Sequence, residues 1–150
     1  MDETLPADAN LPDNAPLVLM VEDDADAAFL LRRLLRKTEL PIRILHLNDG
    51  AKALNYFEEL DHPAPDSDLV QPVLVLLDIK MPKVNGFEVL QRIRERSRPR
   101  RPVVIVTTSD DPKDKQRAAD LGADAFLAKF PTMEELRQLL QQLMTERSAR

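Results

Sequence analysis

Short apolar runs alternate with longer stretches of helical periodicity from residue 17 onward. A short, uninterrupted apolar run predicts a strand buried on both faces, and apolar side chains every three or four residues predict an amphipathic helix. One run, at 42–47, alternates apolar and polar residues and therefore predicts a strand near a sheet edge. The predicted strands cover 17–21, 42–47, 73–77, 103–106 and 124–128, and the predicted helices cover 24–38, 49–60, 86–96, 111–121 and 132–143.

Local signals mark the ends of several predicted helices. Asp111 precedes Pro112, which is the order expected of an N-cap and a first helical residue, and Gly122 is a typical helix stop. Thr132 and Glu135 have the spacing of a capping box. The first predicted helix places a set of apolar side chains on one face, which we expect to be buried: Ala27, Leu30, Leu31, Leu34 and Leu35.

Five strands that alternate with five helices predict an α/β fold. Parallel neighbours need crossover connections, and helical crossovers cover both faces of the sheet. The run at 73–77 is the most apolar and is expected at the sheet centre. In such sheets ligands bind beyond the carboxyl ends of the strands.

Composition restricts the class of protein further. The chain has 150 residues, 43% of them hydrophobic, which fits one domain with a core. It has no cysteine, so disulfides and thiolate chemistry are excluded, and a cytoplasmic location is expected. The net charge of −5 argues against general nucleic-acid binding, and no apolar run is long enough for a membrane span. We expect an acidic flexible tail at 1–16, a domain at 17–145 and a short tail at 146–150.

The segment RIRERSRPRR at 92–101 is rich in arginine. It could form a patch for nucleic acid or an acidic partner. A solvated helix end followed by a loop explains the same composition, and we favour that interpretation.

Chemically active residues follow four of the predicted strands. Glu22 and Asp23 follow the first, Asp78 the third, Thr107 the fourth and Lys129 the fifth. Because parallel strands all end at the same edge, we expect these side chains to lie close together. Neighbouring carboxylates repel one another, and a divalent cation relieves that repulsion.

Oxygen ligands favour Mg²⁺, with Mn²⁺ as an alternative, over zinc. A lysine and a hydroxyl beside the metal complete a site that can bind a phosphoryl group. A carboxylate in that setting can act as a nucleophile and form an acyl phosphate. With three glycines in the chain, a glycine-rich phosphate loop is excluded.

Four segments, LVLMVEDD, PVLVLLDIKMPKVNGFEVL, VVIVTTS and GADAFLAK, resemble the receiver domains of two-component response regulators. The resemblance covers about residues 17–145. It implies a CheY-like, flavodoxin-like fold: a five-stranded parallel sheet in the order 2-1-3-4-5 with five helices on both faces.

The resemblance also implies roles for individual residues. Asp78 matches the phosphoacceptor. Glu22 and Asp23 match the acidic pair that binds Mg²⁺, with Asp23 as the direct ligand and Glu22 acting through water. Lys80 matches the position that offers the metal its backbone carbonyl.

The remaining roles concern the switch. Thr107 matches the hydroxyl residue that turns toward the phosphoryl group, and Lys129 the lysine that pairs with it. Phe126 occupies the aromatic switch position. Lys80 and Ser109 occupy positions that tune the lifetime of the acyl phosphate.

One junction departs from the family. Proline usually follows the final lysine, often through a cis bond, whereas here the order is Lys129, Phe130, Pro131. A cis bond before Phe130 would cost about 2.5–4 kcal/mol, so we expect it to be trans, and the bond before Pro131 is the other candidate for a cis bond. This variation and the long loop at 62–71 resemble receivers that serve phytochrome-type kinases.

The expected function is that of a stand-alone response regulator, which receives a phosphoryl group from a sensor histidine kinase and passes the signal by contact. We expect no enzymatic activity beyond phosphotransfer to itself and autodephosphorylation, and a homodimer could form through the C-terminal helices. An alternative is an Mg²⁺-dependent phosphatase with an aspartyl nucleophile, although Asp78 is followed by Ile79 and Lys80 without the second acid of that motif. Another alternative is a phosphorylation-independent adaptor, suggested by the altered junction after Lys129.

Overall fold

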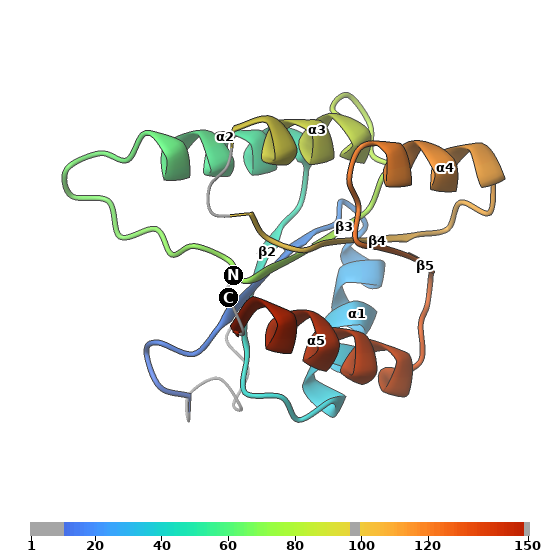
Figure 1. Cartoon of the computed structure of the whole chain (residues 1–150), viewed down its shortest axis with the longest axis horizontal. Helices are drawn as coiled ribbons and strands as arrows, with labels where there is room; N and C mark the ends of the chain where they lie inside the picture. Colours follow the sequence, from blue (N-terminus) through green and yellow to red (C-terminus); the bar gives the residue numbers. More distant parts are fainter. Residues whose placement is uncertain (1–10, 97–99, 149–150) are drawn as a thin grey trace.

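The computed structural model describes residues 11–96 and 100–148 and contains a five-stranded parallel sheet in the order β2-β1-β3-β4-β5. Figure 1 shows α2, α3 and α4 on one face of the sheet and α1 and α5 on the other. The expected fold class and strand order are therefore confirmed. The elements are β1 (Leu17–Val21), α1 (Ala25–Lys37), β2 (Arg43–Leu47), α2 (Gly50–Asp61), β3 (Leu74–Leu77), α3 (Gly86–Arg96), β4 (Val103–Thr107), α4 (Pro112–Asp120), β5 (Ala125–Ala128) and α5 (Met133–Ser148).

The position of each strand follows from its apolar pattern. Every residue of β1, β3 and β4 is buried, because helices cover both faces of these inner strands. Every residue of β2 is only partly buried, and this strand lies at the edge that its alternating sequence predicted. β3 lies at the centre of the sheet, between β1 and β4.

Two apolar cores hold the helices against the sheet. On one face Phe57 of α2 and Leu90 of α3 pack with side chains of the inner strands. On the other face Leu31 of α1 and Leu140 of α5 do the same. All four side chains are at most 2% exposed, and burial of each contributes about 1.5–3 kcal/mol relative to exposure.

The predicted helix ends are present. Asp24 caps α1 by accepting hydrogen bonds from the amides of Asp26 and Ala27, and Asp111 caps α4 with Pro112 as the next residue. Thr132 and Glu135 form both hydrogen bonds of a capping box, at 2.8 and 3.0 Å. Gly122, after α4, has φ +97°, a conformation that glycine adopts without steric cost.

The predicted inner face of α1 was wrong at Leu30, which is 45% exposed. The buried face instead includes Ala28, with Leu31 and Leu35 one and two turns further on. Positions 28, 31 and 35 have helical spacing as good as that of 27, 30 and 34. The packing angle against the sheet decides between them, and a single-helix pattern does not contain that angle.

The chain ends differ in part from the predicted tails. Of the tail at 1–16, residues 1–10 lie outside the described residues, but Ala15 is buried and its carbonyl accepts a 2.9 Å hydrogen bond from Arg43 Nε. α5 continues to Ser148, and 149–150 lie outside the described residues. Across the described part of the chain, no helix is both long and apolar enough to cross a membrane.

The arginine-rich segment forms ion pairs within the domain. Arg92 contacts Asp61 at 2.8 Å, which joins α3 to α2. Arg94 and Arg100 contact the two carboxylate oxygens of Asp124, at 2.8 and 3.0 Å, next to the start of β5. Residues 97–99 lie outside the described residues. These described arginines therefore join elements of the fold rather than form a free basic patch.

Candidate metal and phosphoacceptor site

Strand register brings the chemically active residues to one edge of the sheet. Val21, the last residue of β1, is paired with Leu77, the last residue of β3, so Glu22 and Asp78 leave neighbouring strands at the same level. Thr107 ends β4, and its carbonyl accepts a 2.8 Å hydrogen bond from the amide of Lys129. The structure thus gathers residues that are more than one hundred positions apart in the sequence.

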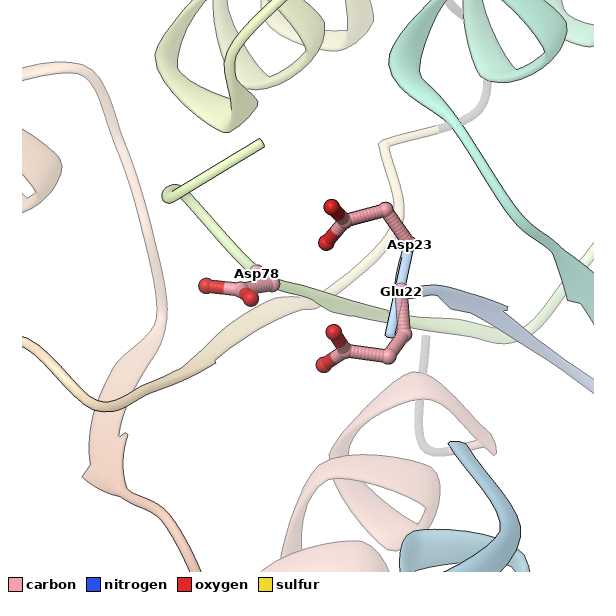
Figure 2. Close-up of side chains that lie close together, drawn as sticks. All are labelled: Glu22, Asp23 and Asp78. Atoms are coloured by element: carbon pink, nitrogen blue, oxygen red, sulfur yellow. The ribbon is translucent and has the colours of Figure 1, made fainter. Parts of the chain in front are cut away.

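Three carboxylates converge at this edge. Figure 2 shows Glu22 and Asp23 extending from the end of β1 on either side of Asp78. One carboxylate oxygen from each of the three residues lies within 4.8 Å of the others. Glu22 and Asp78 are 1% and 4% exposed, whereas Asp23 is open to solvent. Solvent therefore reaches the cluster from the side of Asp23, whereas the protein shields Glu22 and Asp78 from it.

Lys129 joins two of these carboxylates. Its Nζ lies 2.7 Å from Glu22 Oε1 and 3.1 Å from Asp78 Oδ2. The other Asp78 oxygen, Oδ1, accepts a 3.0 Å hydrogen bond from the amide of Lys80. Both oxygens of Asp78 are thus held by donors, which fixes the orientation of the carboxylate.

The peptide bond between Lys129 and Phe130 is cis, and the bond between Phe130 and Pro131 is trans. The expectation of a trans bond before Phe130 was wrong. It rested on the local preference of the peptide bond alone and took no account of the tertiary contacts of Lys129. These contacts are the backbone hydrogen bond to Thr107 and the ion pairs to Glu22 and Asp78.

Burial and charge shift two pKa values in the site. Burial disfavours the Glu22 carboxylate and raises its pKa, and the nearby charge of Asp78 acts in the same direction, while the hydrogen bond from Lys129 opposes them. Burial alone would lower the pKa of Lys129, but its hydrogen bonds and charge attraction to Glu22 and Asp78 outweigh burial and raise it. Lys129 therefore stays an ammonium ion that offsets only part of the negative charge.

Two contacts around Glu22 were not predicted from the sequence. The Glu22 Oε2 atom accepts a 3.1 Å hydrogen bond from the amide of Asp24. His46 of β2 places Nε2 2.7 Å from the Glu22 backbone carbonyl. The pairing of β1 with β2 puts Met20 opposite His46, so this contact could be found only once the register was known.

Thr107, Ser109 and Phe126 complete the predicted set. Thr107 is fully buried at the end of β4, and its Oγ1 accepts a 3.3 Å hydrogen bond from the amide of Ser109. Phe126 lies opposite Ile105 in the β4–β5 pair and packs, partly buried, against the core that faces α2 and α3. The structure thus places all three near the sheet edge, and their switch and lifetime roles stay predictions.

The residues present fit a divalent metal. Carboxylate oxygens are hard ligands, and the buried Glu22 beside Asp78 carries repulsion that Lys129 only partly relieves. Asp23 gives the cluster an open side for water ligands and a phosphoryl group. A divalent metal at the cluster of Glu22, Asp23 and Asp78 is therefore consistent with both its charge and its donors.

Comparison with known proteins agrees with this geometry. The family model of the response regulator receiver domain matches residues 18–141. The probable methanogenesis regulatory protein FilR2 of Methanothrix harundinacea is 35% identical over 128 residues, which is 85% of this chain and 80% of that protein. The response regulator Rcp1 of Synechocystis sp. is 28% identical over 83% of this chain and 84% of its own length.

Two solved structures extend the comparison. The bacteriophytochrome response regulator RtBRR has a TM-score of 0.72 and 32% identity, covering 86% of this chain and 78% of that one. The Mn²⁺-bound form of Rcp1 has a TM-score of 0.67 and 26% identity, covering 85% and 90%. The chain belongs to the response regulator receiver family.

Membership of this family settles the general function. The protein accepts a phosphoryl group from a histidine kinase on an aspartate and switches conformation in phosphorelay signal transduction. The phosphatase alternative is not favoured. Receiver domains bind a divalent metal at an acidic cluster of the kind described above.

Proposed function

We propose that Asp78 is the phosphoacceptor, that Asp23 and Glu22 hold Mg²⁺ beside it, and that Lys129 and Thr107 bind the transferred phosphoryl group. The observation that carries this proposal is the position of Asp78. It is the one carboxylate of the cluster that contacts Lys129 and also lies between the two acids at the end of β1. The Lys80 carbonyl, two residues after Asp78, is proposed as a further metal ligand.

The chemistry proposed is a displacement at phosphorus. A carboxylate oxygen of Asp78 attacks the phosphorus of a phosphohistidine, the phosphorus–nitrogen bond breaks, and the imidazole leaves with a proton. Water later attacks the same phosphorus and releases inorganic phosphate and the free carboxylate. Mg²⁺ would supply charge that offsets the phosphoryl oxygens. Lys129 is held within 3.1 Å of Asp78 and can pair with one of those oxygens.

The switch proposed begins at Thr107. A phosphoryl group on Asp78 offers its hydroxyl a charged acceptor, and Phe126 moves into the space that the threonine leaves. Reversal of a 1:99 balance of two conformations to 99:1 needs about 5.5 kcal/mol of differential stabilisation. A few charge-assisted hydrogen bonds, each worth about 1.5–3 kcal/mol, supply energy of that order.

Phosphoryl uptake by Asp78→Asn tests the assignment. The amide cannot form an acyl phosphate, so we expect incubation with acetyl phosphate and Mg²⁺ to leave the variant without acid-stable, base-labile phosphate. Intact-protein mass spectrometry measures this directly. Asp120→Asn, a substitution on the exposed side of α4, is the matched control and should take up phosphate like the wild type. Normal uptake by Asp78→Asn would refute the assignment.

The proposed partner surface lies beside Lys129. Phe130, the next residue, is 46% exposed and lines a groove of about 380 Å³ together with Leu30 and Leu34 of α1. Phe29, also on α1, is 55% exposed. Large exposed apolar side chains are typical of protein contact sites, and Phe130 directly follows Lys129 of the proposed phosphoacceptor site. We propose that the histidine-bearing domain of the kinase contacts this groove and the exposed Phe29 beside Leu30 on α1.

The kinase proposed is of the phytochrome type. Solved relatives named as phytochrome or bacteriophytochrome response regulators support this, among them RtBRR and AtBRR at 32% and 34% identity. A homodimer through α4 and α5 stays a prediction that sedimentation velocity can check.

A further inference from the structure

Ser109 does not present its side chain to the phosphoacceptor site. Its Oγ donates a 2.5 Å hydrogen bond to Asp114 Oδ2 in the first turn of α4. The same Oγ accepts a 3.3 Å hydrogen bond from the amide of Asp111. Ser109 is only 5% exposed, so its hydroxyl is occupied on the side of α4 and has little access to water.

The backbone amide of Ser109 contacts Thr107 rather than α4. Its amide donates a 3.3 Å hydrogen bond to Thr107 Oγ1, the hydroxyl that we propose binds the phosphoryl group. Hydrogen bonds therefore run from Asp114 through Ser109 to Thr107. These hydrogen bonds connect the first turn of α4 to Thr107 of the proposed phosphoryl-binding site, and the three residues all lie between positions 107 and 114. Thr107 accepts in this contact, which leaves its own hydroxyl hydrogen free for a phosphoryl oxygen.

We propose that Asp114 is a positioning residue for phosphoryl binding, which acts by holding Ser109 and, through the Ser109 amide, the hydroxyl of Thr107. Asp114 acts only through its hydrogen bond to Ser109 and does not bind the phosphoryl group itself. The proposal rests on the proposed function of Thr107 and Asp78.

The physical reason is the cost of ordering the β4–α4 connection. With Asp114 present, the position of Ser109 is fixed before any phosphoryl group arrives. Without it, the buried hydroxyl hydrogen of Ser109 has no acceptor, and an unsatisfied buried group favours rearrangement of the loop. Phosphoryl binding must then restore the position of Thr107, and the entropy lost in doing so weakens binding.

Affinity for beryllofluoride, which mimics the phosphoryl group on an aspartate, tests this proposal. Asp114→Ala is expected to bind beryllofluoride about tenfold more weakly in the presence of Mg²⁺, a factor at the upper end of the range for one ordinary hydrogen bond. Asp114→Asn keeps an acceptor oxygen without the charge and should stay within about twofold of the wild type. A charge effect at the N-terminus of α4 would be lost in Asp114→Asn as well as in Asp114→Ala. Binding close to that of the wild type in Asp114→Asn therefore identifies the hydrogen bond as the cause.

A double-mutant cycle tests whether Asp114 acts through Ser109. Ser109→Ala should weaken beryllofluoride binding by a similar factor, and the variant with both substitutions should bind no more weakly than the weaker single variant. Mn²⁺ affinity, measured without beryllofluoride, should not change in Asp114→Ala because Glu22, Asp23 and Asp78 keep their positions.

Three results would overturn the proposal: unchanged beryllofluoride affinity in Asp114→Ala, effects of the two substitutions that multiply in the double variant, or an equal loss in Asp114→Asn and Asp114→Ala. Asp120→Asn, on the same helix, is the control for a general effect of charge on α4. Failure of the proposed function would look different, since the wild type would then bind beryllofluoride no better than Asp78→Asn.

Discussion

Lys129 sets the charge balance of the site at the scale of single residues. Two carboxylates contact one ammonium group, so the described site keeps a net negative charge before the exposed Asp23 is counted. That residual charge attracts a dication, and it would repel a phosphoryl group in the absence of one. Phosphoryl transfer at this sheet edge therefore needs a metal ion, because the carboxylates carry more negative charge than the ammonium group of Lys129 offsets.

Gly86 is a residue where no other side chain fits. A Cβ at this position would lie 2.3 Å from the Asp78 carbonyl oxygen and 2.6 Å from Ile79 Cα, both of them backbone atoms that cannot turn away. Gly86→Ala should therefore destabilise the fold by about 1–3 kcal/mol and displace the backbone of Asp78. Urea unfolding gives the first effect and Mn²⁺ titration the second.

Gln91→Ala, on the exposed side of the same helix, serves as the control for Gly86→Ala. It should change stability by at most about 0.5 kcal/mol and leave Mn²⁺ affinity as it is. If Gly86→Ala matched this control in both measurements, the close approach of α3 to the Asp78 backbone would be incorrect.

At the scale of elements, α1 carries two functions on two faces. Ala28, Leu31 and Leu35 face the sheet, whereas Phe29 and Leu30 face solvent. The exposed side chains are not part of the core, so they do not contribute to its packing. They supply the apolar contact surface that we propose for the kinase.

Phe29→Ala separates docking from chemistry. Loss of an exposed aromatic anchor should slow phosphotransfer from the kinase about 5- to 30-fold, the range for 1–2 kcal/mol of lost contact. Uptake from acetyl phosphate should be unchanged, since the small donor makes no contact with α1. Rates from both donors, measured by phosphate-affinity electrophoresis, give the comparison.

Val70→Ala is the matched control for Phe29→Ala. Val70 is 39% exposed, but it lies in the connection between α2 and β3, where its carbonyl accepts a hydrogen bond from Tyr56. It should leave both rates unchanged. Equal slowing of Phe29→Ala with acetyl phosphate and with the kinase would contradict a docking role.

For the whole molecule, the acidic cluster couples metal binding to stability. A metal that binds the folded chain and not the unfolded chain stabilises it by about 2.7 kcal/mol at one hundred times its dissociation constant. Mg²⁺ should therefore raise the midpoint of thermal unfolding of the wild type. Differential scanning calorimetry with and without Mg²⁺ measures the shift.

Asp23→Asn is the informative variant for this linkage. It should be slightly more stable than the wild type in chelator, because one repelling carboxylate is gone, and should lose most of the shift with Mg²⁺. Asp120→Asn should keep the full shift. A shift in Asp23→Asn as large as that of the wild type would exclude Asp23 as a ligand.

The sequence by itself determined the elements, their order in the chain and the residues at the strand ends. Apolar periodicity and helix-end signals such as the capping box of Thr132 and Glu135 depend on residues only a few positions apart. They are therefore recognisable in the sequence without the tertiary structure. Parallel strands end at one edge, and this rule alone predicted that Glu22, Asp23, Asp78, Thr107 and Lys129 meet.

Only the tertiary structure decided the contacts that depend on how elements pack. Helix packing turned Leu30 outward, strand register placed His46 against Glu22, and the β4–α4 connection turned Ser109 toward Asp114. The cis bond after Lys129 belongs to the same group. Each depends on distances between groups that are set by packing angles and register, and local sequence patterns carry no information about those quantities.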